Sequence, residues 1–183
     1  QKFNHLKIHT QYSICEGAIK IDKLKDFCKE NKIQCLGLSD TSNLCGALEF
    51  AENISKVGTQ PIIGTQINFK YEDTTGLLPL IALNEKGYKR IINLSSKSYL
   101  ENDNLSDPHL DIKELLIETE GVIILSGTIH GLFGKLFEKG RLEEISKLYQ
   151  AISKKFNDRF YLEIQRHGDQ NEIAFEKFNL QQS

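Results

Sequence analysis

The chain has 183 residues, of which 39% are hydrophobic and 26% charged, and its formal net charge is -2. This composition is that of a globular domain, and the near-neutral charge excludes a general basic surface for nucleic acid. No apolar run is long enough to span a membrane and no secretory signal is present, so we expect a cytoplasmic protein. Free thiols are expected, because no CxxC pair or zinc-finger spacing occurs among Cys15, Cys28, Cys35 and Cys45.

Strand and helix patterns alternate along the chain. Strand patterns, with apolar residues in short runs or at every second position, cover residues 4–10, 34–40, 61–71, 77–83, 121–126 and 159–165. Helical spacing of apolar residues covers 18–31, 43–57, 86–99, 112–119, 132–156 and 172–180. This alternation predicts βα units, an α/β fold and a mainly parallel, barrel-like sheet.

A few residues predict where helices start and stop. Asn43 is expected to cap the second helix, and Gly58 is expected to end it. Gly140 is expected to break the long helical stretch 132–156. The polar segment 101–108 predicts a surface loop of variable conformation.

The first predicted strand carries a row of polar side chains. Alternate residues of a strand point the same way, so His5, Lys7 and His9 are expected to share a face. Imidazoles near the end of a strand suggest a metal site, because α/β folds bind ligands at the carboxyl ends of their strands. Lys7 does not suit a metal site, since its ammonium has three donors and no lone pair.

Further candidate ligands follow later strands. Asp40 ends the second strand, Thr128, His130 and His167 follow the last two, and Glu16 lies in the first loop. Imidazoles and carboxylates bind zinc or manganese, which activate water for attack on phosphoesters. Simpler interpretations stay open: a histidine can be an ordinary polar residue, Asp40 can belong to a helix cap, and His130 can merely start a helix.

Five stretches, in order, resemble the polymerase and histidinol phosphatase (PHP) domain, in particular the one at the amino terminus of bacterial DNA polymerase III alpha subunits. They are residues 5–18, 38–50, 61–66, 121–127 and 158–164. The resemblance implies a distorted (β/α)7 TIM-like barrel. It also implies that residues 1–183 form a single PHP domain that lacks its last units and belongs to a longer polymerase chain.

The resemblance also assigns positions to a metal site. Three positions match the family's ligands, namely His9, Asp40 and His167. The final Asp-x-His motif of the family would follow residue 183.

Other ligand positions depart from the family pattern. Lys7 stands for the first histidine of a His-x-His pair, Thr41 for a histidine, Gln66 for a glutamate and Glu16 for an aspartate. Near the fifth strand, Thr128 takes the usual ligand position and His130 is displaced from it. We therefore expect a vestigial site without a catalytic residue and without a metal, in which Lys7 donates to Asp40 or Glu16 in place of the ion.

The favoured interpretation is a catalytically inactive scaffold. By resemblance, the parent chain is a DNA-directed DNA polymerase that uses magnesium, and this domain supports the polymerase body and docks the proofreading exonuclease subunit on its outer face. One alternative is an active phosphoesterase or 3′–5′ exonuclease that uses zinc or manganese. Another is a free-standing small phosphatase of the same fold.

Overall fold

The computed structural model describes residues 3–13, 16–102 and 107–183. Cys15 and the middle of the predicted loop 101–108 lie outside these residues. The strands are β1 (Cys35–Thr41), β2 (Gln60–Tyr71), β3 (Thr74–Ala82), β4 (Leu110–Asp111), β5 (Val122–Leu125) and β6 (Phe160–Tyr161). The helices are α1 (Ile21–Asn31), α2 (Ala47–Ser55), α3 (Glu85–Leu100), α4 (Ile112–Leu115), α5 (Leu132–Glu138), α6 (Leu142–Phe156) and α7 (Gln170–Gln182), with a 3-10 turn at Asn157–Arg159.

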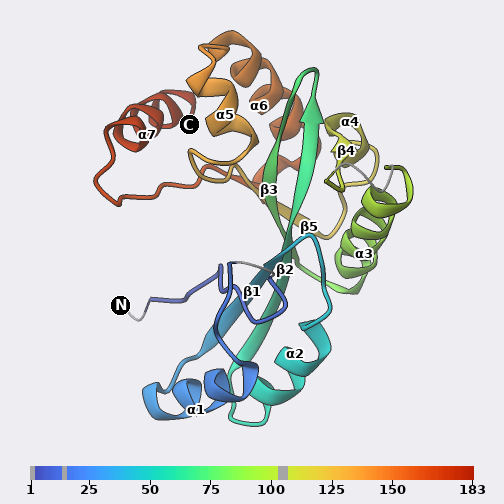
Figure 1. Cartoon of the computed structure of the whole chain (residues 1–183), viewed down its shortest axis with the longest axis vertical. Coiled ribbons are helices and arrows are strands. Elements are labelled where there is room, and N and C mark those ends of the chain that lie inside the picture. The colour runs from blue at the N-terminus through green and yellow to red at the C-terminus, as the bar shows by residue number, and fades with distance from the viewer. Residues whose placement is uncertain (1–2, 14–15, 103–106) are drawn as a thin grey trace.

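The described strands form one sheet in the order β1-β2-β3-β5-β6, with β4 beside β2 (Figure 1). The α/β fold class is confirmed, and within the described residues the sheet stays open, with β1 and β6 at its ends. The sheet is mixed rather than mainly parallel, because β3 runs antiparallel to both β2 and β5. Only Glu72 and Asp73 separate β2 from β3, and such a short connection forms a hairpin, which forces antiparallel pairing.

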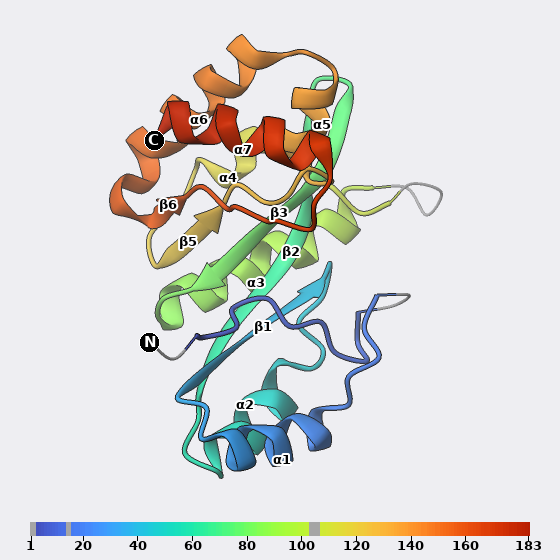
Figure 2. The ribbon, with the colours of Figure 1, turned by 90° about the vertical axis from the view of Figure 1, so that its left-hand side faces the viewer.

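The predicted first strand is an extended segment rather than a strand. It touches its neighbours through isolated bridges, from Ile8 to Leu38 and from Thr10 to Ile19. Its backbone still lies along β1, because the N–H of Ile8 donates to the carbonyl of Gly37 (Figure 2). A Cβ on Gly37 would lie 2.3 Å from the carbonyl oxygen of Leu6, so only glycine allows this approach.

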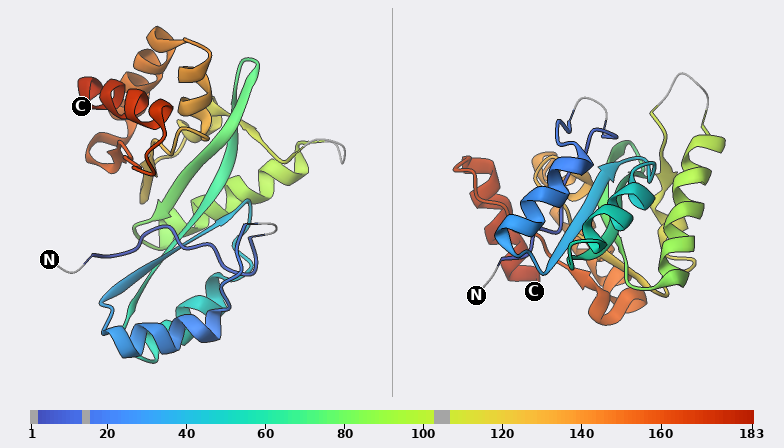
Figure 3. Two further views of the ribbon diagram at one scale, coloured as in Figure 1. Left: turned by 60° about the vertical axis from the view of Figure 1, so that its left-hand side comes forward. Right: turned by 90° about the horizontal axis from the view of Figure 1, so that it is seen from below.

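Buried apolar residues form two clusters. The helices that carry them lie towards opposite ends of the elongated molecule (Figure 3). The larger cluster joins β2, β3 and β5 to helices α3 to α7. The smaller cluster joins α1, β1 and α2. Half-buried Leu44 contacts both clusters, and β2 runs from one end of the molecule to the other.

The structure confirms the helix boundaries predicted at two glycines, and it contradicts the helix cap predicted at Asn43. Gly58 follows α2 with a φ of 82°, and Gly140 separates α5 from α6 with a φ of 73°, as predicted. The prediction that Asn43 caps α2 is wrong: its side chain accepts from the N–H of Cys45 in a turn, and α2 starts after Gly46. Among the described helices, none is long and apolar enough to cross a membrane.

Candidate functional site

A cleft of about 330 Å³ gathers most of the predicted site residues. Its walls come from the N-terminal segment, β2, β3 and the loops that follow β5 and β6. The predicted residues that line it are Lys7, His9, Glu16, Gln66, Thr128 and His130. They are joined there by Leu77, Gly127, Gly131 and Gln165.

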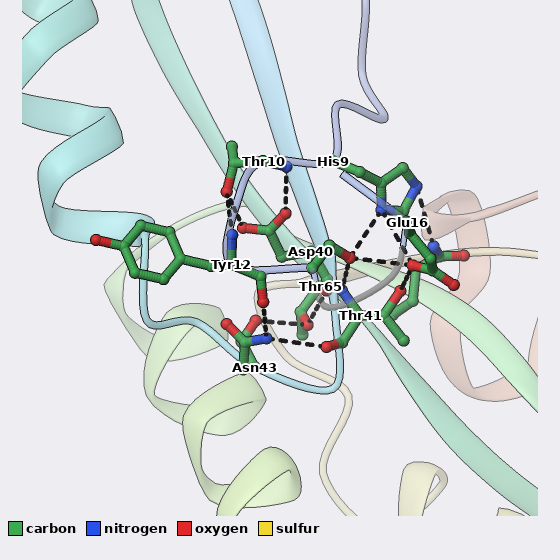
Figure 4. Close-up of polar contacts among 10 residues, drawn as sticks. His9, Thr10, Tyr12, Glu16, Asp40, Thr41, Asn43 and Thr65 are labelled. Carbon is green, nitrogen blue, oxygen red and sulfur yellow. Dashed lines mark hydrogen bonds and ion pairs between the residues drawn. The ribbon is translucent and has the colours of Figure 1, made fainter. Parts of the chain in front are cut away.

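His9 stands at the centre of a hydrogen-bond network beside this cleft (Figure 4). Its Nδ1 lies 3.3 Å from the hydroxyl of Ser13, and its Nε2 lies 3.3 Å from the amide nitrogen of Gln66. The Ser13 hydroxyl is 3.0 Å from a carboxylate oxygen of Glu16 and accepts from the N–H of Thr41. The Thr41 hydroxyl donates to the same oxygen of Glu16 over 2.5 Å.

The chemistry of Ser13 fixes the direction of these hydrogen bonds. A hydroxyl has one proton, and the acceptor-only carboxylate of Glu16 takes it. Ser13 must therefore accept from His9, which places a ring proton on Nδ1. The Nε2 lies 3.3 Å from the amide of Gln66, so both ring nitrogens of His9 have partners within the protein.

Asp40 belongs to the backbone framework and not to the cleft. It is fully buried, and its two oxygens accept from the N–H and the hydroxyl of Thr10, each over 2.6 Å. Its own carbonyl accepts from the hydroxyl of Thr65. Figure 4 shows the Asp40 carboxylate directed at Thr10 and the His9 ring beside Glu16.

His167 lies on the surface, outside the residues that line the cleft. Its side chain is 72% exposed, and its Nδ1 lies 2.9 Å from the carboxylate of Glu172 at the start of α7. This hydrogen bond lowers the pKa of Glu172, and a second one from the backbone N–H of His167 acts in the same direction. His167 therefore stabilises the first turn of α7 through its two hydrogen bonds to Glu172.

Lys7 has a different carboxylate partner from the two that we expected. Its Nζ lies 2.8 Å from an oxygen of Glu163, and the side chains are only 17% and 13% exposed. The prediction that it donates to Asp40 or Glu16 is wrong, because those carboxylates accept from threonine and serine instead.

These contacts decide whether the cleft suits a metal ion. In the described part of the chain, no three His, Cys, Asp or Glu side chains are grouped so that they could hold one. The nitrogens of His9 are occupied within the protein, and a lysine ammonium lines the same walls. The donor set as it stands therefore does not fit a divalent cation.

Sequence reasoning gave no role to three residues that organise the site. Thr10 holds Asp40, Ser13 orients His9, and Glu163 pairs with Lys7. Of these three, Glu163 was the easiest to find from the sequence. It lies within the predicted strand 159–165, and a carboxylate that becomes buried there needs a nearby cation. Ser13 offered little, since one hydroxyl in a polar loop looks ordinary.

Comparison with known proteins agrees with the motifs. A family model described as the PHP domain matches residues 5–167, so the chain belongs to the PHP domain family. The chain is 37% identical to the DNA polymerase III subunit alpha of Caulobacter vibrioides over 96% of its length, and 38% identical to that of Rickettsia felis over 91%. The resemblance expected from the sequence motifs is confirmed.

The chain matches only part of each relative. It spans 16% of the Caulobacter protein and 14% of the Rickettsia protein. Among solved structures, an amidohydrolase from Chromobacterium violaceum shares 16% identity with a TM-score of 0.43. That alignment covers 52% of this chain and 32% of the other.

Proposed function

We propose that this chain is the PHP domain of a bacterial DNA polymerase III alpha subunit and acts there as a non-catalytic scaffold. The observation that carries the proposal is the occupied imidazole of His9, whose Nε2 lies 3.3 Å from the amide of Gln66 and whose Nδ1 lies 3.3 Å from the hydroxyl of Ser13. A hydrolytic metal centre needs free lone pairs at this position. The similarity to alpha subunits over nearly the whole chain supports the polymerase context.

In this proposal, DNA synthesis belongs to the longer chain. The parent protein is a DNA-directed DNA polymerase of replication, and the polymerase body supplies the carboxylates that bind magnesium. The PHP domain contacts that body and meets DNA only through the assembled replicase. Bacterial replication places the protein in the cytoplasm.

We further propose that the proofreading exonuclease subunit docks on the outer face of the domain. The cleft measures about 330 Å³ and its walls are mostly polar or charged. A stable interface buries ~800 Å² on each partner around an apolar centre, which this cleft is too small to provide. A His9→Ala chain that folds but no longer binds the exonuclease subunit would contradict this part of the proposal.

The second candidate function is an active phosphoesterase or 3′–5′ exonuclease that uses zinc or manganese. It is favoured by three potential ligands, His9, Glu16 and His130, which line one cleft. It requires Gln66 to release His9 and Lys7 to leave the cleft.

One experiment separates the two candidates. The purified chain is titrated with Zn²⁺ and Mn²⁺ by calorimetry and assayed on a phosphomonoester and on single-stranded DNA. The scaffold proposal expects no binding below millimolar metal and no hydrolysis above background. A positive control combines Lys7→His, Thr41→His and Gln66→Glu, which together should restore metal binding. Circular dichroism first checks that this variant is folded, because Lys7→His removes the ion-pair partner of Glu163. Stoichiometric metal with hydrolysis by the parent chain would establish the enzyme instead.

A further inference from the structure

The two ends of the open sheet face each other across a groove. At one end, residues 5–8 lie along β1, where the N–H of Gly37 donates to the carbonyl of His5 and the N–H of Ser39 to that of Ile8. At the other end, the chain continues beyond β6 through residues 162–165. A groove of about 370 Å³ lies between them, lined by residues 3–7 on one side and by Leu125 and residues 163–165 on the other.

A single ion pair crosses this groove in the described structure. The Nζ of Lys7 reaches from the N-terminal segment to the Oε1 of Glu163, 2.8 Å away and 156 positions later in the sequence. Both side chains are more than four-fifths buried, with exposed fractions of 17% and 13%. Such a pair responds strongly to the loss of one partner, because the remaining charge stays buried without compensation.

The backbone on each side holds the two charged groups in place. The N–H of Glu163 donates to the hydroxyl of Ser126, which is fully buried at the end of β5. The amide of Gln165 lies 3.3 Å from the same carboxylate oxygen that Lys7 contacts. Among the described residues, the other oxygen of Glu163 is buried without a hydrogen-bond partner, so Lys7 supplies the only cation for this carboxylate.

We propose that the Lys7–Glu163 salt bridge joins the two ends of the open sheet, because it holds the N-terminal segment beside β1 to the chain that follows β6. A divalent cation held by ligands from both edges would join them in the same way. Here the joining cation is the ammonium of Lys7, which is covalently part of the chain. This role concerns the fold itself and does not depend on the proposed polymerase context.

The test is a double-mutant cycle on the 183-residue chain. The variants are Lys7→Met, Glu163→Leu and the two combined, and the measurement is the unfolding equilibrium constant in urea. Each single variant should raise that constant at least tenfold. The combined variant should be more stable than either single variant, because it leaves no buried charge unpaired.

The matched control uses an exposed ion pair of the same residue types. Lys89 and Glu85 lie 2.6 Å apart on α3, with side chains 73% and 79% exposed. Lys89→Met, Glu85→Leu and their combination should each stay within a factor of two of the parent chain.

Hydrogen exchange tests whether the pair joins the two edges. In Lys7→Met and in Glu163→Leu, the N–H groups of Ile8 and of the residue at position 163 should exchange at least fivefold faster than in the parent chain. Should a single variant fail to fold, the combined variant must still fold. A combined variant no more stable than the singles, or one that also fails to fold, would overturn the proposal. Faster exchange confined to one edge would overturn it as well.

Discussion

Asp40 is a motif position whose carboxylate belongs to the buried backbone framework of this structure. The family resemblance assigns this carboxylate to a metal site, yet both of its oxygens accept from Thr10 in a fully buried position. Thr10 belongs to the N-terminal segment and Asp40 to β1, so the two hydrogen bonds fix that segment on the sheet. A carboxylate suits this task because it offers acceptors to both donors at once.

Asp40→Asn is therefore expected to destabilise the fold. The amide retains one acceptor and turns an NH₂ group toward a second donor, which leaves a buried group unsatisfied at a cost of about 1 to 3 kcal/mol. Urea unfolding at pH 7 measures the change. Asp111→Asn is the matched control, because Asp111 is an exposed cap that accepts from the N–H of Lys113. An Asp40→Asn chain as stable as the parent would show that the two hydrogen bonds contribute nothing.

The sequence predicts which residues line the cleft only where these residues stand at the ends of predicted strands. His9 and Thr128 follow from the order of strands, since residues at neighbouring strand ends converge. Gln66 lies within β2, where it pairs with Thr41 at the end of β1. The hydrogen bonds were not predictable, because they depend on which of several nearby donors lies within about 3 Å. Asp40 accordingly turns to Thr10, and Lys7 pairs with Glu163, which is distant in sequence.

Among the elements, those with strong local signals were predicted best. The strand pattern at 61–71 became β2, and Gly140 divides α5 from α6 as expected. β6 contains only Phe160 and Tyr161, although the pattern extended to 165, because its neighbour β5 ends at Leu125. The antiparallel direction of β3 was missed, although the predicted strands 61–71 and 77–83 leave only five residues between them, too few for the crossover that a parallel pair needs.

The start of α7 shows how local polar residues stabilise a helix end. Asp169 accepts from the N–H of Asn171 as the cap, and Glu172, three residues later, accepts from the ring and the backbone of His167. This is a variant of the capping box, in which an acidic residue in the first turn reaches back to the preceding chain. The carboxylate also favours the positive end of the helix dipole.

A pH dependence follows from the lowered pKa of Glu172. A carboxyl whose pKa is lower in the folded state stabilises above its unfolded pKa of about 4.3 and loses that contribution as pH falls through the folded value. Glu172→Gln should therefore be less stable than the parent at pH 7, and the difference should shrink below about pH 4. Urea unfolding between pH 3 and 7 measures this difference.

The control for this prediction is Glu30→Gln, at an exposed position near the end of α1. Its stability relative to the parent should change little across the same pH range. A difference between Glu172→Gln and the parent that stays constant from pH 7 to pH 3 would contradict the assigned role of Glu172.

At the scale of the whole molecule, two apolar clusters share one sheet. Phe50 lies in the smaller cluster of α1, β1 and α2, and Phe133 lies in the larger cluster; both are fully buried. The smaller cluster buries fewer side chains, and its contacts with the rest of the molecule run mainly through β2 and the N-terminal segment. Such a unit is expected to open before the rest of the structure unfolds.

The same substitution in each cluster tests this hierarchy. Phe50→Leu and Phe133→Leu should each lower the global free energy of unfolding by about 1 to 2 kcal/mol. Phe50→Leu should also lower the opening free energy of the amides of α1, β1 and α2, since their cluster loses contacts. Phe133→Leu should leave that opening unchanged, because the larger cluster stays folded while the smaller one opens. Native-state hydrogen exchange measures both quantities, and an equal effect of Phe133→Leu on the β1 amides would show that the chain unfolds as one cooperative unit.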